Sequence, residues 1–326
     1  MKYSNITRRN FIGTGLVLSQ SRGFAADATE FPAKPIHFIV PFAAGGSTDI
    51  LARLIGKEIF GGKQVVIAEN VVGAGGNIAA AKVAQAPADG YTLEIGAMSM
   101  HAMNGSMYKG LSFDPMKDLE PIAMLAYAIN VIAISSTLPV NSFPELIAYI
   151  KSHPGQINYA SGGIGTHNHL TLAMLAKVAN LDIVHVPYKG GGPAVTALLQ
   201  GECTLYAGGA SLLLPHLKSG RVKILAVTER TRTALLPGIP SVSETVKDFE
   251  VTNWYGVFGP KGLETNLKER INQEINRVNK MPEIVQRLAE LGMVTSPMSP
   301  TQLAAVLQSD FKLWSKLIRE LAITAE

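Results

Sequence analysis

The sequence predicts an α/β fold built in two halves, and three observations support this prediction. The chain has 326 residues, about twice the usual size of one domain. Hydrophobic residues make up 47% of it and charged residues 17%, a balance that allows large buried cores. From residue 35 onwards, short β-rich runs alternate with helical patterns across tight turns, as they do where helices cover a parallel sheet. We therefore expect two domains, each a mostly parallel sheet flanked by helices.

The first half of the chain predicts a βαβαβ unit. Residues 36–42 (IHFIVPF) are rich in β-forming residues, and residues 48–60 place apolar side chains on one helical face. A second strand is expected at 64–70, followed by a glycine turn and an alanine-rich helix at 73–86. Residues 88–97 (ADGYTLEIGA) then predict a turn and a third strand. This order implies a parallel sheet covered by helices.

The same rhythm returns in the second half, which ends in helices. Strands are expected at 127–135, 157–162 and 182–188, with helices at 142–154, 166–180 and 192–201, and residues 203–228 complete this half. A last strand at 251–260 precedes helices at 267–279, 282–291 and 299–322. Ser142 and Ser299 are the expected N-caps of two of these helices, each with a proline in the first turn. No linker-like segment separates the halves, so we expect the chain to cross between them more than once.

The formal net charge of +4 originates at the N-terminus, where residues 1–26 hold four basic residues and no acidic one. The remainder is close to neutral and has no basic stripe, so nucleic acid is not an expected partner. The N-terminal stretch contains TRRNFI, a short apolar run at 11–18 and small-residue cleavage options. These features predict a twin-arginine-like signal peptide over residues 1–26 and therefore export of the chain.

Four strand ends, at residues 43–49, 96–104, 161–169 and 188–193, are rich in glycine and small hydroxyl residues, and ligands of open α/β sheets bind at such ends. Two of them predict seats for an anion. In residues 42–49, two glycines and two hydroxyl residues stand at a helix start, where unpaired N–H groups and the positive end of the helix dipole attract negative charge. Residues 161–169 repeat this design in the other half. Two such loops facing one another suit a small ligand with two negative groups, such as a dicarboxylate. Neither a Walker P-loop nor a GxGxxG fingerprint is present, so no nucleotide cofactor is expected.

Several polar residues near these loops allow two interpretations. Asp49 is either a ligand-binding residue or the cap of its own helix. Lys189 either pairs with an anionic ligand or is a solvated loop lysine. His167 and His169 are two positions apart on a helix and therefore point in different directions, and no acidic cluster accompanies them, so no metal site is expected. We expect His169 to point into the cleft and to donate a hydrogen bond.

A hydrolase is the main rival class, with Ser99, His101 and Asp49 as conceivable partners. The nucleophile elbow GxSxG is absent from the chain, so an enzyme is not the expected function. Cys203 is the only cysteine, has no CxxC partner and is expected to be a packing residue.

Four stretches resemble the Bug family, the extracytoplasmic binding proteins of tripartite tricarboxylate transporters. They are PIHFIVPFAAGGSTDILARLI, VVIAENVVGAGGNIAAAKVAQAPADGYTL, GQINYASGGIGTHNHL and HVPYKGGGPAVTALLQGE, and the likeness runs from about residue 35 to the C-terminus. The resemblance implies a type II, Venus-flytrap periplasmic binding protein with two domains. Residues 27–128 with 252–326 would form domain 1, and residues 129–251 would form domain 2.

The resemblance also implies a function. A small carboxylate, meaning a di- or tricarboxylate or an aromatic acid, would be held between the domains and delivered in the periplasm to a membrane permease. The protein would be a monomer without cofactor or metal. The ligand-binding residues expected from the loops and the resemblance are Phe42, Ala43, Gly45, Gly46, Ser47, Thr48, Asp49, Ser99, Ser161, Gly163, Gly165, Thr166, His169, Tyr188 and Lys189. A carboxylate sensor for a receptor is the alternative binding role, and a serine hydrolase is the alternative outside binding.

One departure from the family pattern bears on the ligand. Many members have an acidic or amide residue after the strand that corresponds to residues 203–209, where this chain has Ala207, Gly208 and Gly209. Without that acceptor, an amino-acid ligand is disfavoured. Tyr206 and Trp254 lie in nearby sequence patterns and favour an aromatic or plain aliphatic carboxylate.

Overall fold

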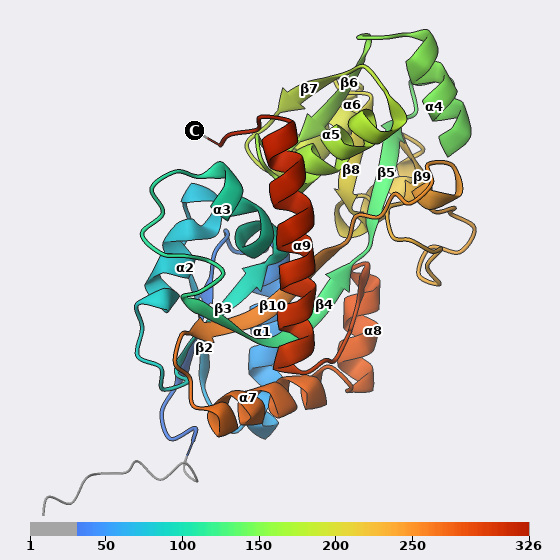
Figure 1. Ribbon diagram of the computed structural model, residues 1–326. Coiled ribbons are helices and arrows are strands. Elements are labelled where there is room, and N and C mark those ends of the chain that lie inside the picture. Colours follow the sequence, from blue (N-terminus) through green and yellow to red (C-terminus); the bar gives the residue numbers. More distant parts are fainter. Residues whose placement is uncertain (1–30, 326) are drawn as a thin grey trace, which may run out of the picture. The chain divides into compact units, whose positions relative to one another are not determined.

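Two sheets form the framework of the described chain. The computed structural model describes residues 31–325, and the signal peptide predicted for residues 1–26 lies outside them (Figure 1). The first sheet has the strand order β11-β4-β10-β3-β1-β2 and the second has the order β7-β6-β8-β5-β9. The first contains β1 (Ile36–Val40), β2 (Val66–Asn70), β3 (Thr92–Ala97), β4 (Leu119–Ala128), β10 (Asn253–Pro260) and β11 (Met293–Val294). The second contains β5 (Asn130–Ser135), β6 (Ile157–Ser161), β7 (Ile183–Pro187), β8 (Leu205–Gly209) and β9 (Val222–Val227).

Both sheets are mixed, which corrects the expectation of mostly parallel sheets. β1 is parallel to β2 and β3, and β6 is parallel to β7 and β8, as the βα rhythm predicts. β10 is antiparallel to β3 and β4, and β5 is antiparallel to β8 and β9. The path of the chain explains this difference. β4 leads directly into β5 of the second sheet, and β10 later brings the chain back beside β4, so the exit and return strands run in opposite directions (Figure 1).

Helices flank both sheets, which confirms the predicted α/β class. The first sheet is accompanied by α1 (Ser47–Glu58), α2 (Asn77–Ala84), α7 (Thr265–Val278), α8 (Pro282–Glu290) and α9 (Pro300–Glu320), and the second by α4 (Phe143–Ser152), α5 (His167–Ala179) and α6 (Gly191–Gln200). Both expected caps are present: Ser142 accepts a hydrogen bond from the N–H of Glu145, and Ser299 forms a capping box with Gln302. None of the helices in residues 31–325 has the length and apolar character needed to cross a membrane.

The strands divide between the sheets by sequence. The first sheet takes its strands from residues 36–128 and 253–294, and the second takes its strands from residues 130–227. One buried hydrophobic cluster includes Trp254 of β10 and Trp314 of α9 together with Leu172 of α5, so both halves contribute to it. The exact domain boundaries stay a prediction.

A buried carboxyl group lies where the chain passes between the sheets. Glu229 accepts a hydrogen bond of 2.8 Å from the N–H of Asn130, the first residue of β5. Next to it, Thr228 donates its N–H to the carbonyl of Asn130 at 3.0 Å and its hydroxyl to the carbonyl of Val251 at 2.6 Å, so it connects the outgoing chain with the returning chain. Burial raises the pKa of Glu229 to about 7, and the nearby charge of Glu250 adds to this rise.

Glu229→Gln is therefore expected to change the pH dependence of stability. A carboxyl pKa that is raised on folding lowers the free energy of unfolding as pH increases from about 4.5 to 7. Glutamine keeps an acceptor for the N–H of Asn130 but cannot ionise, so the variant should match the natural protein at pH 5 and exceed it at pH 8 by up to about 3 kcal/mol. Denaturant unfolding of both proteins at several pH values measures this difference. A difference that does not change with pH would contradict the prediction.

Candidate functional site

The N-termini of three helices meet at one cavity of about 400 Å³, a volume suited to a small molecule. The cavity is lined by Gly46, Ser47 and Thr48 at the start of α1, by Gly165, Thr166, His167 and Asn168 at the start of α5, and by Gly191 and Gly192 at the start of α6. The other lining residues are Phe42, Gly75, Ala97, Ser99, Asn104, Met107, Tyr108, Ala128, Ile164, Tyr206, Gly209, Ser211, Leu212, Asn253 and Tyr255. Because α1 follows a strand of the first sheet and α5 and α6 follow strands of the second, both halves contribute strand ends to the cavity.

The electrostatic character of the cavity comes from its backbone. Within residues 31–325, no aspartate, glutamate, lysine or arginine lines it. α1, α5 and α6 are 12, 13 and 10 residues long. Each helix is long enough for its dipole to place roughly half a positive charge at its N-terminus, beside the cavity. The first N–H groups of a helix lack partners within that helix. The cavity is therefore suited to a small anion that is held mainly by main-chain donors.

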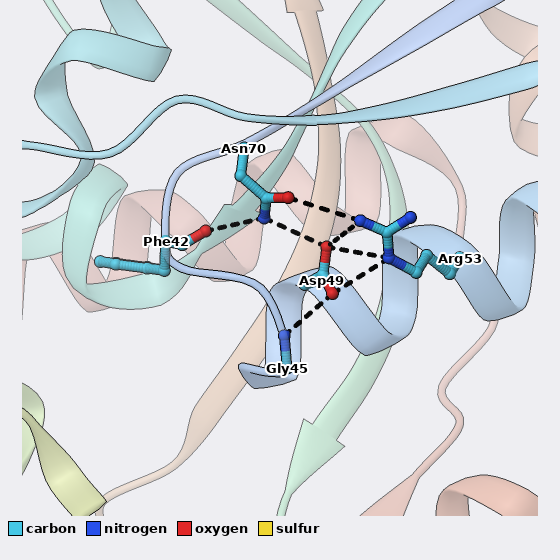
Figure 2. Close-up of polar contacts among 5 residues, drawn as sticks. All are labelled: Phe42, Gly45, Asp49, Arg53 and Asn70. Atoms are coloured by element: carbon cyan, nitrogen blue, oxygen red, sulfur yellow. Dashed lines mark hydrogen bonds and ion pairs between the residues drawn. The ribbon is translucent and has the colours of Figure 1, made fainter.

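The loop from β1 to α1 is fixed by Asp49, which is not the cap of its own helix as one interpretation expected, because Gly46 holds the N-cap position and Asp49 lies within α1. Its carboxylate accepts hydrogen bonds from the N–H of Gly45 at 3.0 Å and from the guanidinium of Arg53 at 2.9–3.1 Å (Figure 2). The side-chain amide of Asn70 donates to Asp49 at 3.1 Å and to the carbonyl of Phe42 at 2.9 Å. Asp49 thus connects the loop, the helix and the end of β2, and it does not line the cavity.

The charge of Asp49 is stable over the whole physiological range. Hydrogen bonds from Arg53 lower the pKa of Asp49 to about 2, with burial opposing them and with the N–H of Gly45 and the amide of Asn70 adding to the decrease. Gly45 has a φ of +81°, a conformation that favours glycine. The loop is therefore held in one shape before any ligand arrives.

Thr48 lines the cavity and has a buried hydroxyl without a partner among the described residues. The residue is 1% exposed, and its Oγ1 has no hydrogen-bond partner in the part of the chain that the structure describes. A buried hydroxyl without a partner costs free energy, and a ligand that accepts its hydrogen bond recovers it.

The loop from β6 to α5 has the predicted glycine-rich form. Gly163 and Gly165 have φ values of +127° and +75°, and the hydroxyl of Thr166 donates to the carbonyl of Gly163 at 2.7 Å. Gly165 lies close to Met107 of the first half, since a Cβ at position 165 would be 2.7 Å from the Met107 sulfur. Gly165 and Thr166 line the same cavity as Gly46, Ser47 and Thr48, so both predicted loops contribute to it.

The histidines of this loop differ from the expectation. His169 does not line the cavity: its ring stacks on His185 with 3.9 Å between the ring centroids, and its Nδ1 accepts a hydrogen bond of 3.0 Å from the N–H of Gly165. His167 does line it, and its Nε2 donates to the carbonyl of Thr252 at 3.1 Å. Burial lowers the pKa of both His167 and His169 to about 4, so both are neutral at pH 7. Among the residues described, no group of three or more His, Cys, Asp and Glu side chains is placed to hold a metal.

The remaining predicted site residues divide into two groups. Phe42, Gly46, Ser47, Thr48, Ser99, Gly165 and Thr166 line the cavity, whereas Ala43, Gly45, Asp49, Ser161, Gly163, His169, Tyr188 and Lys189 do not. Lys189 is exposed, and the hydroxyl of Tyr188 pairs with Cys203 at 3.5 Å beside a neighbouring cavity.

Ser99 reaches the cavity from a short π-helical turn, Ser99–Met103, that precedes α3 (Asn104–Met107). His101 in the same turn is fully buried, with Nε2 3.1 Å from the carboxylate of Glu94 and its ring stacked on Phe258 at 3.7 Å. Because Asp49 is engaged by Arg53, the three residues of the hydrolase alternative do not form a catalytic triad.

The list of expected ligand-binding residues missed several lining residues. Asn104 and Asn168 lie in the predicted strand ends 96–104 and 161–169 but were not singled out there. Asn253 and Tyr255 reach the cavity from β10, and no motif marks them. The start of α6 lies in the predicted strand end 188–193, within which Gly191 and Gly192 were not singled out.

A family model described as tripartite tricarboxylate transporter family receptor matches residues 55–323. The chain belongs to this receptor family. The protein BugT of Bordetella pertussis is 31% identical to it over 91% of this chain and 93% of its own length, which confirms the resemblance to the Bug family. Members of the receptor family are solute-binding proteins, so the hydrolase alternative is not favoured.

Two solved structures share the fold of this receptor and about 30% of its sequence. Rpa4515 of R. palustris, solved with adipate, is 31% identical with a TM-score of 0.82, over 90% of this chain and 99% of that one. MatC of Rhodopseudomonas palustris, solved with bound malate, is 29% identical with a TM-score of 0.77, over 88% and 100%. The predicted fold of a periplasmic binding protein is confirmed by these similarities.

Proposed function

We propose that this receptor binds a small carboxylate in the cavity at the starts of α1, α5 and α6 and delivers it to the membrane permease of a tripartite tricarboxylate transporter. The observation that carries the proposal is the meeting of three helix N-termini at a cavity without any charged side chain among the described residues. Rpa4515 with adipate and MatC with malate support a carboxylate as the ligand class.

The helix starts balance the charge of a carboxylate in the cavity. A carboxylate that leaves water needs several hydrogen bonds and a positive potential to offset the lost hydration. Main-chain N–H groups at helix starts supply both, and they are already oriented before binding. Asp49, Ser161 and His169 take part as positioning residues that fix the loops, rather than as groups that contact the ligand. Ser161 does so through its hydroxyl, which accepts from the N–H of Gly163 at 3.1 Å.

The proposed place of action is the periplasm. The signal peptide predicted at residues 1–26 would direct the chain to the periplasm, where the monomeric receptor would meet its permease. Fractionation of cells that express the full-length chain tests the location, and co-purification with the permease tests the partner.

A thermal-shift screen over mono-, di- and tricarboxylates tests the ligand class. A ligand at 100 times its dissociation constant adds about 2.7 kcal/mol to the free energy of unfolding, or about 5 °C in Tm for a protein of this size. We expect such a shift with at least one carboxylate and none with neutral sugars. A shift with sugars or cations alone would contradict the proposal.

Thr48→Val separates ligand binding from stability. The substitution removes an unpaired buried hydroxyl, so the ligand-free protein should be as stable as before or slightly more stable. A hydrogen bond to a charged group contributes about 1.5–3 kcal/mol, so affinity for the best carboxylate should fall roughly 10- to 100-fold. Calorimetric titration measures the affinity.

Thr171→Val is the matched control for this variant. Thr171 is also fully buried, but its hydroxyl already donates to the carbonyl of His167 at 2.8 Å and does not line the cavity. This control should lose some stability and keep its affinity. Equal affinities of the Thr48→Val variant and the natural protein would remove Thr48 from the binding site.

A further inference from the structure

Two asparagines that line the cavity have their amide nitrogens fully occupied by the protein. Asn168 of α5 donates from Nδ2 to the carbonyl of Ala207 at 2.7 Å and to the hydroxyl of Tyr206 at 3.1 Å. Asn104 of α3 donates from Nδ2 to the carbonyl of Gly75 at 3.0 Å and to Oδ1 of Asn77 at 2.8 Å. Each amide NH₂ has two hydrogens, so both donors of each side chain are used.

These contacts also fix which way each amide is turned. A backbone carbonyl is only an acceptor, so the side-chain atom beside Ala207 or Gly75 has to be the nitrogen. The atom that each asparagine has left for the cavity is its carbonyl oxygen, Oδ1, which has no partner among residues 31–325. The cavity therefore presents acceptors from both halves of the chain, in addition to the main-chain donors at the helix starts.

A plain carboxylate cannot satisfy these acceptors, because it has no hydrogen to donate at neutral pH. An ammonium group could donate, but it would enter a cavity with three positive helix ends and no acidic side chain in the described part of the chain. A hydroxyl group is neutral, donates one hydrogen bond and fits a single acceptor. Of the three substituents, the hydroxyl matches both the acceptors and the charge of the cavity.

We propose that the ligand is a hydroxy acid whose carboxylate lies at the helix starts and whose hydroxyl donates to Oδ1 of Asn168, with Asn104 offering a second acceptor. This inference rests on the proposed function and makes the ligand class more specific. It replaces the plain or aromatic carboxylate expected from the sequence. Trp254, one basis of that expectation, is buried away from the cavity, with its indole N–H on Asp310 at 2.6 Å.

The test compares ligands that differ in one group. Calorimetric titrations of the purified mature chain use succinate, malate and aspartate, and then glutarate, 2-hydroxyglutarate and glutamate. In the series of the better fitting length, we expect the hydroxy acid to bind at least tenfold more tightly than the plain acid, and the amino acid to bind most weakly. If no acid of either series or of the thermal-shift screen binds, the proposed function itself fails. If carboxylates bind and the hydroxyl gives less than a twofold advantage, this inference is overturned and the proposed function stands.

Variants at position 168 assign the preference to Asn168. Asn168→Leu removes the acceptor and should abolish the advantage of malate over succinate. Asn168→Asp adds a negative charge and should raise the affinity for aspartate relative to malate at least tenfold. The ratio of two affinities within one variant is the readout, because a general disturbance of the site would lower both affinities alike. Unchanged ratios in both variants would overturn the assignment.

Asn158→Asp is the matched control. Asn158 also donates its amide to a backbone carbonyl, that of Glu202 at 2.9 Å, but it does not line the cavity. Its substitution should leave all ligand ratios unchanged. Circular dichroism and Tm values of each variant establish that it is folded before the ratios are compared.

Discussion

Asp49→Ala is expected to weaken carboxylate binding roughly 10- to 100-fold although Asp49 does not line the cavity. The substitution removes the acceptor for the N–H of Gly45 and leaves Arg53 and Asn70 without their shared partner. Removing one partner of a buried charged group costs about 1–3 kcal/mol of stability. The loop would then lose its single conformation, and binding would have to restore the order that Asp49 now maintains.

Calorimetric titration and denaturant unfolding of the Asp49→Ala variant measure the two effects. Glu290→Ala is a suitable control, because Glu290 forms an exposed ion pair of 2.8 Å with Arg287 on α8 and lies outside the cavity. Exposed pairs of this kind contribute little, so the control should change neither quantity by more than about 0.5 kcal/mol. An Asp49→Ala variant with natural affinity would show that the loop does not depend on this carboxylate.

Gly208→Ala is expected to have the second large effect, because there is no room for a methyl group beside Asn168 and Tyr206, two residues that line the cavity. A Cβ at position 208 would lie 2.1 Å from Nδ2 of Asn168 and 2.6 Å from the hydroxyl of Tyr206. Both side chains would have to move, at a cost of about 1–3 kcal/mol in stability. Their hydrogen bond would be disturbed, and the affinity for the best carboxylate should fall more than tenfold.

A double-mutant cycle tests the mechanism of this loss. If the clash with Asn168 is the cause, Gly208→Ala should cost markedly less stability in an Asn168→Ala background, and the two changes should not add. Additive effects on the free energy of unfolding would contradict the clash. Thermal or denaturant unfolding of the four proteins supplies the cycle.

The parts of the site that could be predicted are those encoded by neighbouring residues. The run from Gly45 to Thr48 and the glycines before Thr166 are local signals, since a helix start and the turn before it are set by a few consecutive residues. The strand and helix pattern also placed both loops at strand ends, where the structure has them.

The parts that could not be predicted depend on contacts between distant residues. Asp49 was ambiguous because its partner Asn70 lies 21 positions further along the chain. Asn168 gained its orientation from Ala207, 39 positions away, and Asn104 from Gly75, 29 positions away. His169 was expected to point into the cleft, but its ring stacks on His185 of β7 and does not line the cavity. The antiparallel strands likewise follow from the return of β10 beside β4, which local periodicity does not encode.

A cavity whose positive potential is built from amide groups has a consequence for the environment in which the protein works. Amide dipoles cannot gain or lose protons, and His167, which lines the cavity, already holds its neutral form at pH 7 because burial lowers its pKa to about 4. A receptor outside the cytoplasmic membrane, as proposed here, is exposed to the acidity of the surrounding medium. Its affinity for an anionic nutrient should therefore stay constant over changes in external pH that would weaken a binding site whose positive charge came from histidine.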